Sequence, residues 1–179
     1  TASDVHQVFQ HIVDEHGVRG AVKAKSMLSE EVGLNPFLEA CGVELFETDL
    51  GEYIIQLLGE PPSHIVGPAI HKSLEDVQGL FRDRLGTPSD ASPEELAKAA
   101  RRVLRDAFLT AELGISGGNF LVAETGSIAL IENEGNIRMS TSLPRIHVAL
   151  VGIEKVLPRW ADLPTFLQVT SKSATGQPV

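Results

Sequence analysis

Residues 18–47 read VRGAVKAKSMLSEEVGLNPFLEACGVELFE, and this stretch decides the class of fold. Short apolar, β-type runs at Val18–Ala24 and Val43–Glu47 predict two strands. The residues between them predict helical turns, the last of which begins with Asn35 as its N-cap and ends at Gly42. A strand–helix–strand crossover of this length predicts parallel strands with a right-handed connection, and therefore an α/β fold.

Capping residues and apolar stripes predict further helices before and after this unit in the sequence. The clearest follows Ser92, where an N-cap serine, Pro93 at the first helical position and Glu95 at the third coincide. Its apolar face, which includes Leu104 and Phe108, lies opposite a face rich in Lys and Arg. Further helices are predicted at residues 4–16, 53–58, 73–84 and 162–170, and a short extended segment at residues 64–67.

Strands are predicted again in the C-terminal third of the chain. Phe120–Ala123 and Ser127–Ile131 are apolar runs separated by a polar turn. Asn133–Asn136 is a second predicted turn, and the almost wholly apolar Ile146–Val151 predicts a central strand buried on both faces. Because helices and strands alternate and no internal repeat is visible, the sequence predicts a single α/β domain over residues 1–179, with a mixed sheet between helix layers.

The composition argues against several classes of protein and site. The chain has 179 residues and a formal net charge of −9, which argues against a surface for nucleic acid or for an anionic membrane. Cys41 is the single cysteine, so the chain forms no internal disulfide and no Cys-ligated iron–sulfur cluster of its own. No apolar run approaches the ~20 residues of a membrane span, and no metal-binding, Rossmann, P-loop or nucleophile-elbow motif occurs. We therefore expect neither membrane insertion nor a metal site.

The stretch Ala111–Ser140 carries the most suggestive chemistry. Its glycines stand next to Asn and Glu between apolar strands, which indicates close approach of the backbone to a ligand or to the neighbouring chain. Glu124 ends a predicted buried strand, so it could be a nucleophile or a base, or a turn acid bonded to nearby N–H groups. Asn119 and Asn136 could donate hydrogen bonds to a carboxylate or phosphate, or serve as turn residues beside Gly.

Cationic side chains complete the predicted site. Arg138 could bind a substrate carboxylate through both arms of its guanidinium, or pair with Glu132 or Glu134. Lys23 and Lys25 alternate at the end of a predicted strand, where burial of both would be unfavourable, so one is expected to face a ligand. From the residues alone, the sequence supports an anion-binding α/β domain and leaves the reaction open.

The ends of the predicted strands indicate where such a ligand would bind. In open α/β sheets, ligands lie outside the carboxyl ends of the strands. These ends fall at Lys23–Met27, Thr48-Asp49 and Gly152–Lys155, which makes the three segments candidates for lining the site.

The chain resembles the LUD domain of lactate-utilization protein B over nearly its whole length. The resemblance rests on segments that follow one another in the family's order: Val22–Met27, Glu47–Leu58, Glu60–Ile65, Pro68–Lys72, Gly118–Ser127, Asn133–Arg138, Leu143–His147, Gly152–Pro158 and Ser173–Gln177. Matches this long and in this order are specific to the family.

The resemblance implies a three-layer α/β/α fold with a mixed, largely parallel sheet. This fold is similar to that of glucosamine-phosphate deaminases, ribose-phosphate isomerases and CoA transferases. It also implies a subunit of a cytoplasmic bacterial complex that oxidises L-lactate to pyruvate together with other lactate-utilization subunits, in an electron-transfer or scaffold role.

Family members continue past the LUD domain into a Cys-rich, ferredoxin-like module that holds iron–sulfur clusters. We therefore expect no cofactor in this chain and no lactate dehydrogenase activity from it alone. The family also begins earlier and extends the LUD domain beyond Gln177, so the domain is expected to be incomplete at both ends. A missing strand would leave an open sheet edge, which tends to pair with another chain, so a homo-oligomer is one expected outcome.

Three functions are open on these grounds. The leading one is an electron-transfer or scaffold subunit of a lactate-oxidising complex. It would carry an anion pocket lined by Lys25, Asn119, Asn136 and Arg138, with Glu124 as an acid/base or orienting group. The second is a CoA- or acyl-transferase-like enzyme that uses Glu124 as its nucleophile. It rests on a resemblance to CoA transferases, in which a glutamate before Asn-Gly is the covalent nucleophile. Glu124-Thr125-Gly126 is similar to that motif, with Thr in place of Asn. The third is a non-enzymatic module that assembles with partner subunits.

Overall fold

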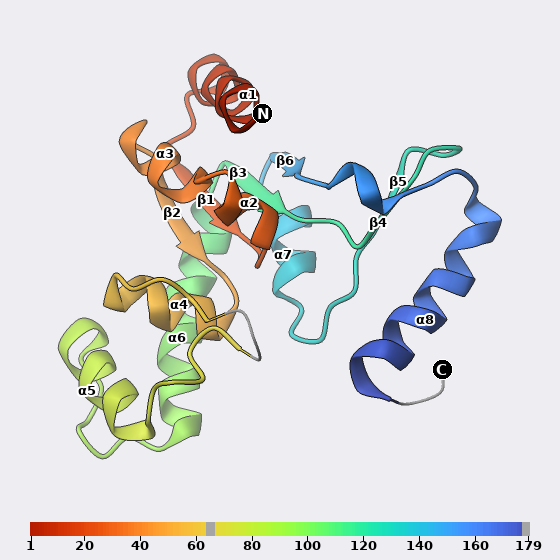
Figure 1. The fold of residues 1–179 in the computed structure, drawn as a ribbon. Helices are drawn as coiled ribbons and strands as arrows, with labels where there is room; N and C mark the ends of the chain where they lie inside the picture. The colour runs from red at the N-terminus through yellow and green to blue at the C-terminus, as the bar shows by residue number, and fades with distance from the viewer. Residues whose placement is uncertain (64–66, 177–179) are drawn as a thin grey trace.

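The computed structural model describes residues 1–63 and 67–176 (Figure 1). The α-helices of these residues are α1 (Ala2–His16), α2 (Met27–Glu31), α3 (Leu34–Ala40), α4 (Leu50–Leu58), α5 (Leu74–Leu85), α6 (Pro93–Thr110), α7 (Asn136–Ser142) and α8 (Leu163–Thr175). The strands are β1 (Gly20–Lys23), β2 (Glu44–Glu47), β3 (Leu113–Ser116), β4 (Phe120–Val122), β5 (Ser127–Ala129), β6 (Ile146–Ala149) and β7 (Val156–Leu157). Short 3₁₀ turns are η1 (Ile153–Lys155) and η2 (Trp160–Asp162). The segment predicted as extended at residues 64–67 lies, apart from Gly67, outside the described residues.

Sheet A consists of parallel strands in the order β2-β1-β3-β6. β1 pairs with β2 so that Lys23 lies opposite Glu47, and it pairs with β3 so that Val22 lies opposite Gly114. The predicted parallel crossover between β1 and β2 is therefore confirmed. Because all the strands run in one direction, their carboxyl ends meet at the same edge of the sheet.

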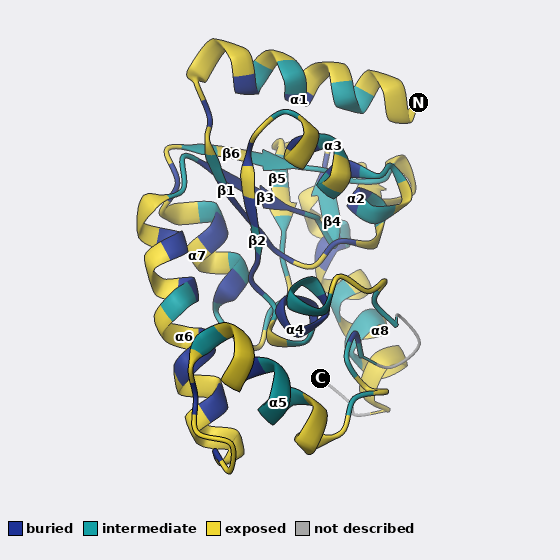
Figure 2. Cartoon of the chain, turned by 90° about the vertical axis from the view of Figure 1, so that its left-hand side faces the viewer, coloured by how far each residue is buried: buried dark blue, intermediate teal, exposed yellow. Residues whose placement is uncertain are grey.

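Helices cover both faces of sheet A (Figures 1 and 2). Successive residues of a strand point to opposite faces, and β1 shows which helices lie on each. Ala21 packs in a core cluster with Phe9 of α1 and Leu38 of α3. Val22 packs with Phe81 of α5 and Phe108 of α6. The expected α/β class with three layers is thus confirmed.

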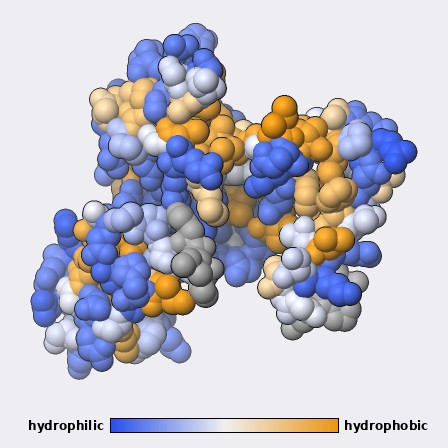
Figure 3. Space-filling model, viewed as in Figure 1, coloured by the Kyte–Doolittle hydropathy of each residue, from blue (hydrophilic) through white to orange (hydrophobic). Residues whose placement is uncertain are grey.

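A second, smaller sheet stands beside the first. Sheet B has the order β5-β4-β7, with β4 antiparallel to β5 and parallel to β7. Val122, Leu157 and Leu163 form its core beneath α8. Apolar surface extends over sheet B and α8 (Figure 3), where Trp160 and Phe166 are exposed. The expected mixed sheet is therefore divided into one fully parallel sheet and one small mixed sheet.

The central strand predicted at Ile146–Val151 lies at an edge instead. β6 covers Ile146–Ala149 and, among the described residues, pairs with β3 alone. Its side chains are half-buried or exposed. The inner position belongs to β3, Leu113–Ser116, all of whose residues are buried and which the sequence does not predict. An apolar run reports a tendency to be buried and carries no information about which strands flank it.

Helix α7 replaces the turn and loop expected around Asn133–Asn136. Gly135 precedes it with a φ of 79°, a left-handed conformation that favours glycine. The helix packs on β3 at Gly114, where a Cβ atom would lie 1.8 Å from the carbonyl oxygen of Ser140. Tertiary packing, not intrinsic helix propensity, stabilises α7, because its Asn, Ser and Thr residues are weak helix formers.

Capping residues set the starts of α5 and α6 as predicted. The capping box at Ser92 opens α6, and a second at Ser73 opens α5. Asn35 is not the N-cap of α3, because Gly33 takes that position. Asn35 lies in the first turn instead, where its Nδ2 donates a hydrogen bond to Oε1 of Glu47 at 2.6 Å. This contact joins α3 to the end of β2.

Candidate functional site

A polar cavity of about 360 Å³ lies at the carboxyl ends of β1, β3 and β6. We call it the strand-end pocket. Its polar lining comprises Lys25, Ser26, Asp49, Ser116, Gly117, Gly118, Asn119, Glu132, Asn133, Asn136 and Lys155. The three predicted strand-end segments each contribute to it, through Lys25, Asp49 and Lys155. Ser116 is the residue that the sequence misses, because it ends the unpredicted strand β3.

The strand-end pocket is lined by two cations without carboxylate partners. Neither Lys25 nor Lys155 forms an ion pair within 4 Å with another residue in the described ranges. Lys23, by contrast, is fully buried and pairs with Glu47. Lys23 is the last residue of β1 and points into the core, whereas Lys25 follows β1 and lines the strand-end pocket; that Lys25 faces a ligand stays a prediction. An anion that entered the pocket would meet ammonium groups that are free to bind it.

Two amides and a glycine shape the same pocket. Oδ1 of Asn119 accepts the N–H of Ile131 at 2.8 Å, which leaves its Nδ2 group available as a donor. Asn136 begins α7 and lines the pocket, although it is only 8% exposed. Gly118 lets the chain pass close to the β6 end, because a Cβ atom there would lie 2.6 Å from Cγ2 of Val151. The site thus combines cations with hydrogen-bond donors.

The structure leaves two of the predicted site residues outside the strand-end pocket. Glu124 lies on the exposed turn after β4, where its Oε2 accepts the backbone N–H of Trp160 at 2.8 Å. Arg138 is 81% exposed and pairs through Nε with Oε1 of Glu132 at 3.2 Å, which is one of its two expected alternatives. Lys25, Asn119 and Asn136 are therefore brought together without them. A catalytic role for Glu124 stays a prediction.

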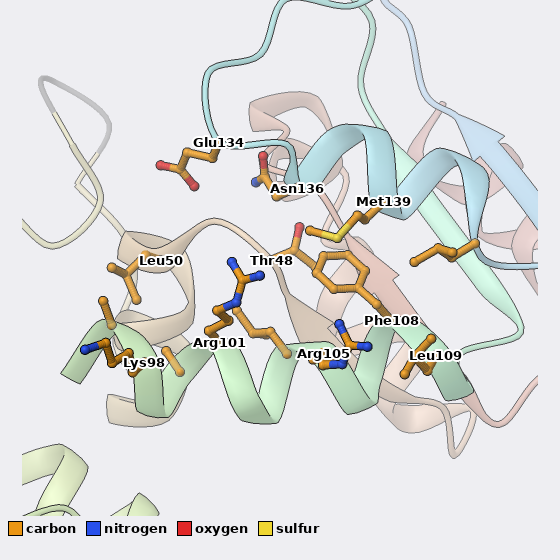
Figure 4. Close-up of a pocket in the computed structure, with 14 residues that line it drawn as sticks. Thr48, Leu50, Lys98, Arg101, Arg105, Phe108, Leu109, Glu134, Asn136 and Met139 are labelled. Carbon is orange, nitrogen blue, oxygen red and sulfur yellow. The ribbon is translucent and has the colours of Figure 1, made fainter. Parts of the chain in front are cut away.

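A second cavity, of about 430 Å³, lies between α6 and α7 (Figure 4). We call it the α6–α7 pocket. Its apolar lining includes Leu50, Leu104, Phe108, Leu109, Met139 and Leu143, and its polar lining is Thr48, Lys98, Arg101, Arg105, Glu134 and Asn136. Asn136 lines both cavities, so the first turn of α7 separates them.

A buried cluster of charges lies at the ends of β1 and β2. Nζ of Lys23 lies 2.8 Å from Oε1 of Glu47, and both side chains are almost fully buried. Burial raises the pKa of Glu47, and the charge of Lys23 opposes that shift. Glu52 of α4 is 4% exposed, and burial together with the carboxylates of Glu47 and Glu30 raises its pKa to about 7. This cluster cannot be predicted from the sequence, because an acid in the first turn of a helix is common at the surface.

Replacing Glu52 with glutamine is expected to stabilise the domain at pH 8 and to change it little at pH 4. The folded state binds this proton more tightly than the unfolded state, so the free energy of unfolding falls as pH rises between 4.5 and about 7. The rise in the pKa of Glu52 corresponds to a loss of about 3 kcal/mol in the free energy of unfolding at high pH. Urea unfolding of both proteins at several pH values measures it, with the exposed Glu39→Gln as control. Equal stability gains at pH 4 and pH 8 would contradict the assigned pKa.

The described residues show no metal centre. No group of three or more His, Cys, Asp or Glu side chains within them is arranged to hold a metal ion. Cys41 is half-buried, and its Sγ donates to Oε1 of Gln10 at 3.1 Å. An iron–sulfur cluster needs several thiolate ligands, so the residues of this chain do not fit one. No helix in the described ranges is long and apolar enough to cross a membrane.

Comparison with known proteins gives consistent matches along the chain. The family profile described as LUD domain matches residues 1–178. Lactate utilization protein B of Shouchella clausii (strain KSM-K16) is 46% identical over 178 residues, and that of Oceanobacillus iheyensis (strain HTE831) is 45% identical over 177 residues. A protein of Escherichia coli (strain K12) named "Uncharacterized electron transport protein YkgF" is 43% identical over 176 residues.

These alignments cover 98–99% of this chain but only 37–38% of each relative. The chain thus spans less than two fifths of the length of the curated relatives that it matches. No solved structure matches the chain significantly. The likeness to deaminases, isomerases and CoA transferases therefore stays a prediction.

Proposed function

The chain belongs to the LUD domain family, and from this premise we propose that it serves lactate utilization by binding a small carboxylate, L-lactate or pyruvate, in the strand-end pocket. The observation that supports the proposal most directly is the placement of Lys25 and Lys155 beside the amides of Asn119 and Asn136; neither lysine forms an ion pair with a described residue. A carboxylate needs such donors, and an α-hydroxyl group can bond to an amide oxygen or a serine.

We assign different contacts with the carboxylate to the lysines and to Asn119. The ammonium groups of Lys25 and Lys155 would neutralise the carboxylate. Nδ2 of Asn119, whose orientation is held by its bond to Ile131, would donate to a carboxylate oxygen. The pocket of about 360 Å³ is larger than a three-carbon acid requires, so part of it stays open to a larger ligand or a partner segment.

We further propose that the chain acts within a longer lactate-utilization subunit of a cytoplasmic complex that oxidises L-lactate to pyruvate. The names and greater length of the relatives support this proposal. Because Cys41 is the only cysteine here, iron–sulfur clusters would be held by parts of the full-length protein beyond this chain, or by its partner subunits. The LUD domain would then bind the acid and dock those partners, while electron transfer takes place elsewhere.

Lys25→Ala is expected to weaken L-lactate binding at least tenfold. Loss of a hydrogen bond to a charged group costs about 1.5–3 kcal/mol, which corresponds to roughly a 10- to 150-fold increase in Kd. Isothermal titration with L-lactate, with pyruvate and with propionate measures this effect. Propionate lacks the α-hydroxyl and is expected to bind more weakly than L-lactate.

Lys172→Ala is the matched control, because Lys172 is an exposed lysine on α8 and does not line the pocket. It is expected to leave the Kd for L-lactate unchanged. Absence of binding to the folded wild-type chain at millimolar ligand would refute the carboxylate site. In that case a role in subunit assembly, the alternative without a ligand, would become the better explanation of the family match.

A further inference from the structure

We propose that the α6–α7 pocket is a second binding site, which takes a small amphipathic anion: an apolar chain or ring that carries one carboxylate, sulfonate or phosphate group. The proposal rests on one cavity of about 430 Å³ that combines an apolar floor with cations that form no ion pair among the described residues. A cavity of this size holds a ligand much larger than a three-carbon acid. The site is independent of the proposed lactate site, although Asn136 borders both.

The apolar floor of this groove comes from residues of two helices, α6 and α7. Leu104 and Phe108 of α6 form its base and are 8% and 5% exposed. Met139 of α7 extends toward Phe108 in Figure 4 and remains 39% exposed. Exposed apolar area inside a concave pocket gains stability when a ligand removes it from water, at about 25 cal/mol per Å². The groove is therefore suited to an apolar group.

The cations lie along the rim of the same groove. Arg101 and Arg105 are one helical turn apart on α6 and are both exposed. In Figure 4 the guanidinium of Arg101 extends from α6 toward the segment that carries Glu134 and Asn136. Neither arginine forms an ion pair within 4 Å with any residue in the described part of the chain. Like charges at this spacing repel one another, and an anionic group between them would relieve that repulsion.

The charge balance of the pocket runs against that of the chain. The molecule carries a net charge of −9, whereas the pocket lining contains Lys98, Arg101 and Arg105 against one carboxylate, Glu134. Cations concentrated over an apolar floor favour a ligand with both properties and disfavour a neutral one. Arginine provides planar, forked donors that match the oxygens of a carboxylate, sulfonate or phosphate.

The test uses two fluorescent probes that share an apolar body and differ in charge. 8-Anilinonaphthalene-1-sulfonate is the anionic probe, and N-phenyl-1-naphthylamine is its neutral counterpart. The wild-type chain is expected to bind the anionic probe at least tenfold more tightly. In the double variant Arg101→Gln/Arg105→Gln, the Kd of the anionic probe is expected to rise at least tenfold. The Kd of the neutral probe is expected to change by less than about twofold, because only the charged contact is lost. Decanoate is expected to displace the anionic probe from the wild-type protein.

Two further variants locate the site. Arg102→Gln removes a neighbouring exposed arginine of α6 that does not line the pocket. It is expected to leave the Kd of both probes unchanged. Met139→Gln makes the floor more polar, and it is expected to weaken the binding of both probes. Equal weakening by Arg102→Gln and by the double variant would overturn the proposal, as would equally tight binding of both probes to the wild-type chain. Lactate binding by the double variant is expected to be unchanged, so the two proposed sites can fail separately.

Discussion

Gly114→Ala is expected to destabilise the domain by about 3 kcal/mol or more. Gly114 lies in the middle of β3, and an added Cβ atom would meet the carbonyl oxygen of Ser140 at 1.8 Å and Cγ of Pro144 at 3.1 Å. The first of these atoms belongs to the backbone of α7, so no side-chain rotation can relieve the clash. The whole helix has to move away from sheet A. Against a typical total stability of 5–15 kcal/mol, this is a large loss.

Urea unfolding followed by circular dichroism measures the loss, and Gly79→Ala provides the matched control. Gly79 lies inside α5, and a Cβ atom there would meet nothing within 4 Å. Alanine in that position is expected to stabilise the domain by about 0.5–1 kcal/mol, because it reduces the entropy lost on folding. A loss below 1 kcal/mol for Gly114→Ala would show that α7 is not tightly seated on β3.

The same substitution links the fold to both candidate sites. Helix α7 carries Asn136, which lines the strand-end pocket and the α6–α7 pocket alike. If α7 shifts away from β3, both cavities change shape. We therefore expect Gly114→Ala to weaken the binding of L-lactate and of the anionic naphthalene probe together, whereas Lys25→Ala and Arg101→Gln/Arg105→Gln each affect one ligand.

Local signals in the sequence predict most of the helices and the parallel character of sheet A. The capping boxes at Ser73 and Ser92 are recognisable within four residues of chain, and the structure shows both. The parallel pairing of β1 with β2 follows from the length of the helical connection between them. These features depend on neighbours in sequence, and for that reason they can be read without a structure.

The elements that the sequence misses depend on partners far along the chain. β3 has only four residues, and Gly114 in its centre lowers its apparent strand tendency. That glycine is present because α7 packs against it, and α7 in turn has a weak helical sequence that is held by the same contact. Each element is explained by the other, so neither can be predicted first. The edge position of β6 is hidden for a similar reason, since pairing order is a property of the whole sheet.

The candidate site was predicted in part. Lys25 follows the predicted strand β1 and lines the strand-end pocket, whereas Asn119 lines it from the segment after β3, which the sequence does not predict. Glu124 also follows a strand, but β4 belongs to sheet B, whose ends point to a different place. The position of a residue after a strand therefore indicates a shared site only when the strands share a sheet. Glu52 could not be recognised, because its neighbours Glu30 and Glu47 come from other elements.

Lys23→Met is the second substitution with a large expected effect, a loss of about 3–5 kcal/mol at pH 8. Methionine keeps much of the apolar volume of lysine and removes only the charge. Glu47 then remains buried with Asn35 Nδ2 as its hydrogen-bond donor, at 2.6 Å, and without a counter-charge. Because burial already raises the pKa of Glu47, loss of Lys23 raises it further. The loss of stability is therefore expected to grow as pH rises and to shrink toward pH 4, where the carboxyl is protonated in both states.

The double variant Lys23→Met/Glu47→Gln separates the ion pair from the packing around it. A neutral amide in place of Glu47 keeps an oxygen for Asn35 and removes the unpaired charge, so most of the lost stability is expected to return. Unfolding free energies of the wild-type chain, Lys23→Met, Glu47→Gln and the double variant form a cycle whose coupling term is expected to exceed about 1 kcal/mol. Additive losses would contradict the assignment, because they would mean that Lys23 and Glu47 contribute independently. Coupling would instead show that this opposed pair on β1 and β2 holds the end of sheet A, from which Lys25 enters the strand-end pocket.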